Sequence, residues 1–280
     1  TDQQAGVALV FNGTLYNYPD LRKELQALGH NFKSTGDTEV ILRSYIEWGE
    51  NCVARLQGMF AIAIWDSKKQ SLLMARDRSG IKPLYFSQTP QRLLFASNTQ
   101  ALIHADDKID TSIDANAMHN LFTLHAVVPA PRTIIKGIRK VKPAHYMLID
   151  NKGRVEEKRY WRLTAKRPDK KMTEQDWITA THDALRLAVE KRVKIADVPV
   201  GVLLSGGIDS SLLVGLLAEA GQKGLKTFSV GFEDAPEEKG NEFEYSDAVE
   251  QEFGPEHHQL MVLNKQELHR LHDAFAQMAP

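Results

Sequence analysis

The chain has 280 residues, of which 42% are hydrophobic and 25% are charged, a composition ordinary for a globular protein and a length that suits about two domains. Its 35 basic and 36 acidic residues leave a net charge of −1, which argues against nucleic acid or a membrane surface as a partner. No apolar run reaches membrane-spanning length, no signal-peptide pattern is visible, and Cys52 is the only cysteine, so a reducing cytoplasm is the expected location.

The first hundred residues alternate between strand-like and helix-like patterns. Residues 6–11 predict a strand that ends in a turn at Asn12-Gly13. The remaining predicted elements are helices at 18–28 and 38–48, a β-hairpin formed by 59–66 and 71–76, and a further strand pair at 84–86 and 92–96. Together these elements predict an α+β layer arrangement.

The middle of the chain gives weaker signals. Residues 106–165 are mixed, and their basic positions are interpreted as a solvated surface. Residues 165–171 are charged and contain a proline, which favours an interdomain linker. Thr173 is predicted to open a helix with Asp176 as its capping-box partner, and this helix is expected to end near residues 197–199.

The last hundred residues predict a parallel sheet. An apolar strand at 200–204 is followed by a Ser-Gly-Gly turn and a helical run at 212–220, and further strands are predicted at 226–232 and 259–263. Ligands of such sheets bind at the carboxyl ends of the strands. The turn and the end of the next strand are therefore expected to border one crevice.

The strand–turn–helix segment has the chemistry of a phosphate site. Gly206 and Gly207 let the backbone approach an anion closely, and the N-terminus of the helix attracts negative charge. Ser205, Ser210 and Ser211 add hydroxyl donors. Asp209 would repel a bare phosphate, but it fits if Mg²⁺ bridges its carboxylate to the phosphate oxygens.

An ordinary turn without a ligand is the alternative for this segment, and the absence of a Gly-Lys-Ser/Thr ending excludes a Walker loop. The complete string resembles the pyrophosphate-binding loop of the ATP pyrophosphatases. His257-His258 lacks further ligands at metal-binding spacing and is interpreted as structural.

Several ordered motifs point to one family. They are Asn12-Gly13-Thr14-Leu15-Tyr16-Asn17, the strings at 35–40, 57–63, 76–85 and 95–97, and the serine–glycine turn that begins at Ser205. Together they resemble the glutamine-hydrolysing asparagine synthetase family over essentially the whole chain. The strings at 11–13, 16–18 and 127–132 resemble its N-acetylglutaminylglutamine amidotransferase branch.

The resemblance implies roles in glutamine binding and hydrolysis for the first half. The side-chain amide of Asn12 and the backbone N–H of Gly13 would form an oxyanion hole, and Asp37 would hold the α-ammonium of glutamine. Thr14 replaces an acidic residue of the family, so glutamine anchoring is expected to differ. Taken singly, Asn12-Gly13 fits a common turn and Asp37 fits a helix N-cap.

The family's nucleophile is an N-terminal cysteine whose α-amine serves as base. The resemblance places that residue several dozen positions before Asn12, so the sequence is expected to be a piece that lacks both ends and does not hydrolyse glutamine. Cys52 is internal and is interpreted as a buried, inert thiol.

The resemblance also implies the organisation of the chain. Residues 1–165 would form an incomplete class II glutamine amidotransferase domain, an Ntn-hydrolase-like αββα sandwich, and residues 173–280 an incomplete α/β ATP-pyrophosphatase-type domain with a parallel sheet. In the latter, Leu203 and Val230 would contact adenine, the loop from Ser205 to Ser211 would hold pyrophosphate, and Asp209 would bind Mg²⁺.

The implied reaction is ATP-dependent amide synthesis, in which ammonia from glutamine attacks an adenylated carboxylate, either aspartate or a small peptide-like acid. Two alternatives stay open: a relative with an inactive glutaminase domain, like the β-lactam-forming synthetases, and a nucleotide- or amino-acid-binding module without turnover. The sequence does not specify the oligomeric state, and a homodimer stays open.

Overall fold

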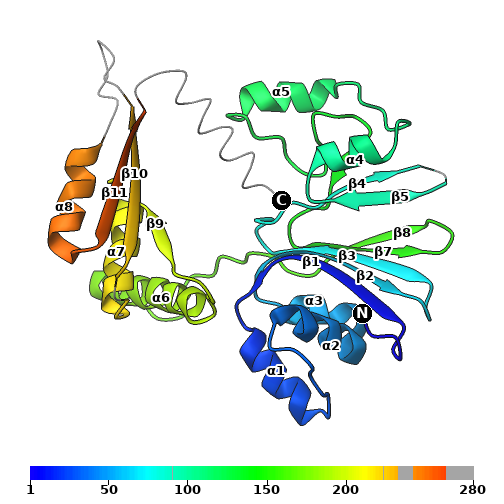
Figure 1. The fold of residues 1–280 in the computed structure, drawn as a ribbon, viewed down its shortest axis with the longest axis horizontal. Coiled ribbons are helices and arrows are strands. Elements are labelled where there is room, and N and C mark those ends of the chain that lie inside the picture. The colour runs from blue at the N-terminus through cyan, green and yellow to red at the C-terminus, as the bar shows by residue number, and fades with distance from the viewer. Residues whose placement is uncertain (90, 223, 233–241, 263–280) are drawn as a thin grey trace. The chain divides into compact units, whose positions relative to one another are not determined.

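A computed structural model describes residues 1–89, 91–222, 224–232 and 242–262. The chain divides into two compact units, Thr1–Lys166 and Arg167–Pro280, and each is described by itself (Figure 1). In the described part of the chain, no helix combines the length and the apolar character needed to cross a membrane.

The first unit contains two antiparallel sheets and five α-helices among its described residues. One sheet has the order β1-β2-β3-β7-β8 and the other β5-β4-β6. The strands are β1 (Val7–Leu15), β2 (Gly58–Asp66), β3 (Ser71–Arg76), β4 (Tyr85–Gln88), β5 (Leu93–Ala96), β6 (Arg139–Lys140), β7 (His145–Asp150) and β8 (Val155–Arg159). The helices are α1 (Tyr18–Ala27), α2 (Asp37–Trp48), α3 (Cys52–Arg55), α4 (Thr99–Ala105) and α5 (Ala115–Thr123), with a 3₁₀ turn at Gly49–Asn51.

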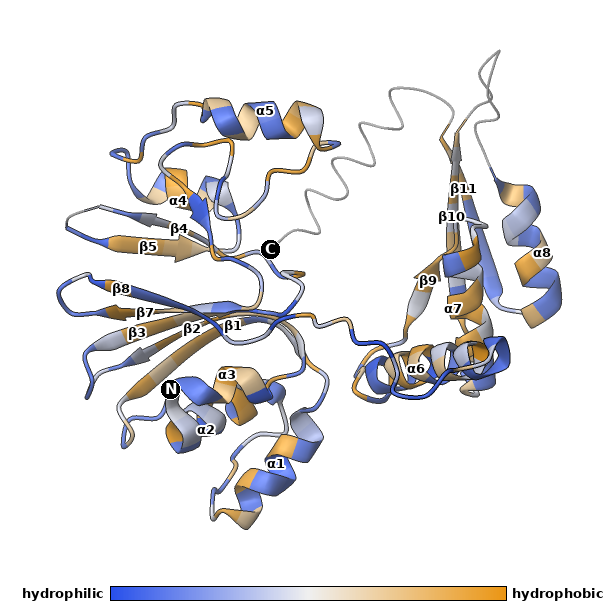
Figure 2. Ribbon diagram, turned by 180° about the vertical axis from the view of Figure 1, so that it is seen from behind, coloured by the Kyte–Doolittle hydropathy of each residue, from blue (hydrophilic) through white to orange (hydrophobic). Residues whose placement is uncertain are grey.

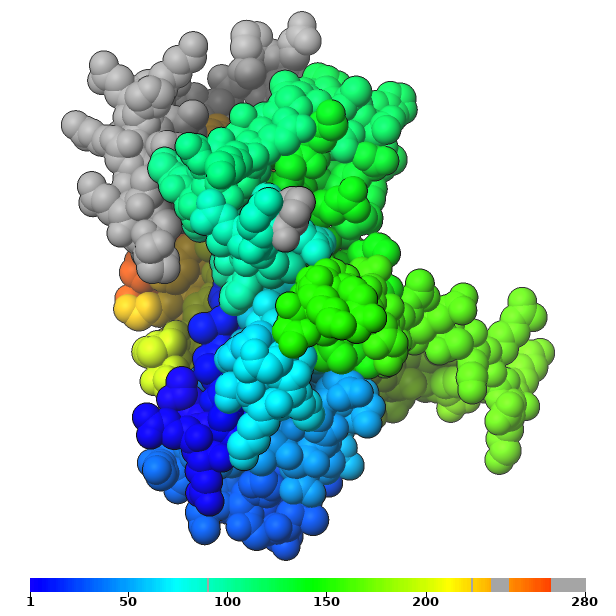
Figure 3. Space-filling model, turned by 90° about the vertical axis from the view of Figure 1, so that its right-hand side faces the viewer, coloured from blue at the N-terminus to red at the C-terminus, as the bar shows by residue number. Residues whose placement is uncertain are grey.

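The elements of this unit form four layers. Figure 2 shows the two sheets stacked face to face, with α1, α2 and α3 outside the five-stranded sheet and α4 and α5 outside the other. Figure 3 shows the same succession of chain segments, from blue through cyan to green. The α+β layering expected from the sequence is therefore confirmed as an α/β/β/α sandwich.

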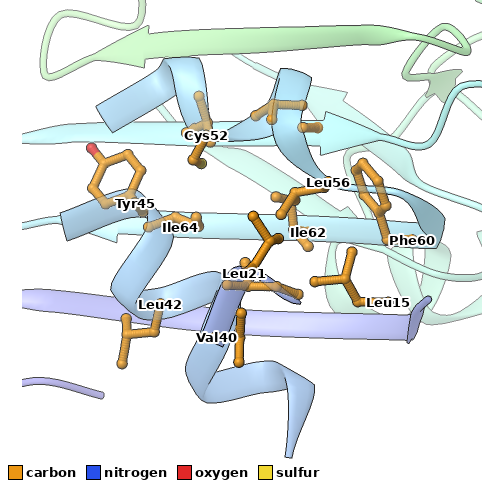
Figure 4. Close-up of a cluster of buried hydrophobic side chains, with 14 of the residues drawn as sticks. Leu15, Leu21, Val40, Leu42, Tyr45, Cys52, Leu56, Phe60, Ile62 and Ile64 are labelled. Carbon is orange, nitrogen blue, oxygen red and sulfur yellow. The ribbon is translucent and has the colours of Figure 1, made fainter. Parts of the chain in front are cut away.

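Three apolar clusters hold these layers together. The largest lies between the five-stranded sheet and its helices and includes Leu15, Val40, Phe60 and Ile64 (Figure 4). A second cluster, with Met74 and Phe86, fills the space between the sheets, and a third lies under α4. Side chains of these sizes each contribute roughly 1.5–3 kcal/mol when buried, so packing between the layers is the main source of stability.

One sequence expectation for this unit is wrong, and three of its strands were not predicted. β1 does not turn at Asn12-Gly13 but continues to Leu15, because every residue from Val7 onward pairs with β2. The basic positions of residues 106–165 are exposed or half-buried, as interpreted, but the segment also supplies β6, β7 and β8 and the buried Ile138 and Val141, which were not predicted. Their strands were missed because each contributes only a few apolar residues to a shared core.

The second unit has three described strands in one parallel sheet, in the order β11-β10-β9. The strands are β9 (Gly201–Leu203), β10 (Lys226–Phe232) and β11 (Glu256–Val262), and the helices are α6 (Glu174–Lys194), α7 (Ile208–Glu219) and α8 (Phe243–Phe253). The predicted parallel sheet is confirmed. Helix α8, which connects β10 to β11, was not predicted.

Side chains of all three helices pack with β9 in one apolar cluster that includes Val189, Val202, Val214 and Val249. The buried residues of β10 alternate with exposed ones, so the sheet buries one face and exposes the other. At the start of α6 the capping box predicted for Thr173 and Asp176 is present in both directions. Such a cap stabilises a helix by about 1 kcal/mol.

Candidate functional site

The predicted oxyanion residues lie within β1 of the first unit. Asn12, Gly13 and Thr14 pair with Ala61, Phe60 and Met59 of β2. Gly13 has φ +149°, and a Cβ placed there would lie 2.0 Å from the carbonyl oxygen of Met59. Only glycine fits this close approach of two strands, so the Asn-Gly pair marks a constricted strand position rather than a turn.

The side chain of Asn12 faces the space between the two sheets. Its Nδ2 donates a hydrogen bond of 3.1 Å to Oγ of Ser97, just beyond β5. Both residues line a cavity of about 220 Å³ together with Phe11, Ala61 and Phe95. Because an amide nitrogen carries two hydrogens, the Nδ2 group still has a second donor for a ligand. Ser97 belongs to the motif at 95–97, but no pattern in the sequence assigns it a role.

Asp37 reaches the end of the same strand. Its Oδ2 accepts a hydrogen bond of 3.0 Å from the backbone N–H of Leu15, directly after Thr14. It is the first residue of α2, whose N-cap is Gly36, so the alternative that Asp37 caps the helix is wrong. The fold thus brings Asp37 to Leu15, the neighbour of Thr14, across 22 positions of sequence separation. Their role in holding glutamine stays a prediction.

The Arg76-Asp77 string holds a loop rather than a ligand. The Asp77 side chain is 0% exposed and accepts four backbone hydrogen bonds, from Phe60, Ser79, Ile81 and Lys82. The Arg76 guanidinium donates to the carbonyl oxygens of Gly80, Lys82 and Val141, and burial lowers its pKa. This motif therefore fixes the connection between the two sheets, a role that spacing alone could not reveal.

Cys52 lies in the core of the first unit. It is 0% exposed, packs in the cluster with Tyr45 and Ile64, and burial raises the pKa of its thiol to about 12 (Figure 4). A nucleophilic cysteine needs access and a lowered pKa. The expectation that this thiol is buried is confirmed, and its inertness stays a prediction.

The serine–glycine loop of the second unit joins β9 to α7 at the carboxyl end of the sheet. The hydroxyls of Ser205 and Ser210 lie 3.1 Å apart, and the Ser210 and Ser211 hydroxyls donate to the carbonyl of Gly207 at 3.1 and 2.8 Å. These hydrogen bonds hold the loop against the N-terminus of α7. α7 begins at Ile208, four residues earlier than predicted, so Asp209 lies in its first turn and is exposed.

Gly206 has a specific steric role in this loop. Its φ is +81°, and a Cβ placed there would lie 2.6 Å from Cβ of Tyr245 in α8. The helix that the sequence did not predict therefore packs directly behind the loop. Gly207, by contrast, has φ −72°, and its added Cβ would meet only Oγ of Ser205, at 3.4 Å.

The two predicted adenine contacts lie on the exposed face of the sheet. Leu203 is 79% exposed and pairs with Phe228, and Val230 is 52% exposed and lies two residues further along β10. The structure thus places both residues and the loop at one end of one sheet. Their contact with a nucleotide stays a prediction.

Comparison with known protein families shows which family the chain belongs to. A model described as glutamine amidotransferase domain matches residues 1–161, and a model described as asparagine synthase matches residues 180–278. The chain belongs to the glutamine-hydrolysing asparagine synthetase family. The expected resemblance is confirmed, whereas the finer assignment to the N-acetylglutaminylglutamine branch stays a prediction.

Two members of this family from Bacillus subtilis (strain 168) show the extent of the similarity. Asparagine synthetase [glutamine-hydrolyzing] 3 is 33% identical over 95% of this chain and 44% of its own length. Asparagine synthetase [glutamine-hydrolyzing] 1 is 39% identical over 80% of this chain and 34% of its own length. The chain therefore spans less than half the length of these relatives.

Among solved structures, the B. subtilis glutamine phosphoribosylpyrophosphate amidotransferase complexed with ADP and GMP is 20% identical. It covers 81% of this chain and 46% of its own, with a TM-score of 0.40.

Proposed function

We propose that this chain carries the glutamine-binding and ATP-binding parts of an enzyme that makes an amide from a carboxylic acid. The observation that carries the proposal is the loop of the second unit, where a parallel strand, two glycines and a helix N-terminus meet at the carboxyl end of the sheet. Its family supports the same reaction class. In this reaction a carboxylate oxygen displaces pyrophosphate from ATP, and ammonia then displaces AMP from the acyl carbon.

The loop fits a nucleoside triphosphate by geometry. The N-terminal N–H groups of a helix lack partners within the helix and attract anions. In α7 the first helical hydrogen bond runs from the N–H of Ser211 to the carbonyl oxygen of Gly207. Exposed Ser205 adds a hydroxyl. We propose that these groups bind the phosphates and that Leu203 and Val230 border the adenine.

Asp209 is the residue of this loop that fits a cation. Its carboxylate is exposed in the first turn of α7, next to where the phosphates would bind. Bound Mg²⁺, held by Asp209 and phosphate oxygens, would neutralise charge on the phosphates. Without the cation, this carboxylate would repel them, which is why we assign it a metal-binding role.

For the first unit we propose that Asn12 Nδ2 and the Gly13 N–H stabilise negative charge on the glutamine carboxamide oxygen, a contribution of about 3–4 kcal/mol in comparable sites. Asp37 would hold the α-ammonium group, and Thr14 would accept a hydrogen bond without adding charge. We infer that this unit follows the Ntn-hydrolase pattern and that, because Cys52 is buried, these 280 residues do not hydrolyse glutamine.

The test is exchange of labelled pyrophosphate into ATP by the natural protein, with candidate carboxylic acids added one at a time. We expect exchange that depends on one acid and is lost in Asp209→Asn. Glu219→Gln is the matched control, because it removes an exposed carboxylate from the opposite end of the same helix. Equal exchange in Asp209→Asn and in the control would refute the proposed role of the loop.

The same assay separates the alternatives. If exchange occurs but neither glutamine nor free ammonia yields an amide, the protein belongs with relatives whose glutaminase domain is inactive and whose acyl group closes a ring. If ATP binds and no acid supports exchange, the second unit is a binding module.

A further inference from the structure

A second group of ligating side chains lies in the second unit, away from the serine–glycine loop. Asp247 and Glu250 of α8 and His257 of β11 each offer one ligand atom, and these three atoms lie within 4.8 Å of one another. Asp247 and Glu250 are three positions apart and share one helix face, which turns them toward the same point. The sequence did not suggest this site, because α8 was not predicted and a His-His pair alone is a weak signal.

His257 is oriented as a metal ligand would be. Its Nδ1 lies 2.7 Å from Oγ1 of Thr227, its register partner on β10, and Thr227 is fully buried. Its Nε2 is shielded from solvent and has no hydrogen-bond partner among the described residues. Metal-binding histidines commonly donate from one ring nitrogen to a second group, which leaves the other nitrogen as the ligand.

The unpaired nitrogen needs an explanation, because a buried polar atom without a hydrogen-bond partner destabilises the folded protein. If Nδ1–H donates to Thr227, the lone pair of Nε2 is available to a cation. Asp247 already accepts a hydrogen bond from Gln259 through Oδ1, which steadies this carboxylate and leaves its other oxygen available.

We propose that Asp247, Glu250 and His257 bind a divalent transition-metal ion of the zinc type, with water completing the coordination. One imidazole and two carboxylates match the ligands of Zn²⁺, whereas Mg²⁺ and Ca²⁺ prefer oxygen ligands alone. The site goes beyond the proposed ATP chemistry and is separate from Asp209. His257 pairs with Thr227 near the amino end of the parallel sheet, and the loop with Asp209 follows the carboxyl end of β9.

The ion would join α8 to β11 and thereby fix the helix that backs the loop. The amino-terminal turn of α8 lies against Gly206 through Tyr245, and the two carboxylates follow on the same helix. We therefore assign the ion a structural role, which is to hold α8 in place.

The experiment is a calorimetric titration of the metal-stripped 280-residue chain with Zn²⁺ in excess Mg²⁺, with the visible absorption of Co²⁺ as a second readout. We expect one saturable site that is lost in His257→Gln and in Asp247→Asn. His258→Gln is the matched control: this neighbouring ring stacks on Phe228 with ring centroids 5.0 Å apart and pairs with Glu256. We expect it to bind Zn²⁺ like the unaltered chain.

A further variant tests the proposal even if a substitution of a metal ligand prevents folding. Thr227→Val keeps the volume of the side chain but removes the partner of Nδ1, and we expect it to weaken Zn²⁺ binding about 10- to 100-fold. The proposal is overturned if the folded chain binds no Zn²⁺ in the presence of Mg²⁺. It is equally overturned if His257→Gln, Asp247→Asn and Thr227→Val all bind as tightly as His258→Gln.

Discussion

The two adjacent glycines of the loop should respond very differently to the same substitution. In Gly206→Ala the new Cβ would lie 2.6 Å from Cβ of Tyr245 and 3.2 Å from the carbonyl oxygen of Glu242, and the backbone would keep φ +81°. Placing alanine in this left-handed region costs about 1–2 kcal/mol, and overpacking adds about 1–3 kcal/mol. We expect a combined loss of about 2–5 kcal/mol, concentrated in α7 and α8.

Gly207→Ala is the matched control. Its φ of −72° suits any residue, and its nearest neighbour would be Oγ of Ser205 at 3.4 Å. Because Gly207 is the N-cap of α7, alanine there costs about 1 kcal/mol or less. Its Cβ would, however, lie beside the path of an incoming phosphate, so this variant should fold and bind ATP less tightly.

Hydrogen exchange resolved by peptide is the appropriate assay, because it reports the opening free energy of each helix separately. Gly206→Ala should speed exchange in α7 and α8 by about 30-fold or more, since 1.4 kcal/mol corresponds to a factor of ten. Gly207→Ala should leave their protection within about tenfold of the unaltered chain. Equal protection in the two variants would refute the steric interpretation of Gly206.

Three further predictions concern other parts of the fold. Cys52 should react with a thiol reagent only at the rate at which the core opens. Because burial raises the pKa of its thiol from 9.0 to about 12, the stability that Cys52 contributes should be full below pH 9 and should fall as the pH rises toward 12. Denaturation measured as a function of pH would show this loss. Burial would raise the pKa of Asp66, but hydrogen bonds from the N–H of Lys69 and the hydroxyl of Tyr45 outweigh burial and hold this pKa below 3.8. Asp66→Asn should therefore destabilise the chain at neutral pH. A destabilisation that did not shrink as the pH falls below 3.8 would contradict this account. Thr173→Ala should cost about 1 kcal/mol by removing the cap of α6, detected as faster exchange in its first turns, and unchanged exchange there would count against the cap.

The sequence predicted those elements whose signal is local. The hairpin of β2 and β3, the capping box at Thr173 and the parallel strand β10 all follow from short patterns, because alternation, caps and turns are written in neighbouring residues. The family, too, could be inferred from ordered motifs. It was the string of motifs, and not any single residue, that made the inference specific.

What the sequence did not predict depends on contacts between distant segments. The continuation of β1 through Gly13 is set by its pairing with Met59 and Phe60, and the bond between Asn12 and Ser97 joins two sheets across 85 positions. Likewise, α8 carries four acidic residues among eleven, and it is positioned by its packing on β10, β11 and α7. His257 became a candidate ligand only when this helix placed two carboxylates beside it.

The central claim is that the serine–glycine loop binds ATP with Mg²⁺, and calorimetric titration of ATP·Mg²⁺ into the 280-residue chain tests it most directly. We predict saturable binding that is lost in Asp209→Ala and in Gly207→Val and kept in Glu219→Gln. If the chain melts cooperatively yet binds no ATP, or if all three variants bind ATP like the unaltered chain, the account of this loop is contradicted.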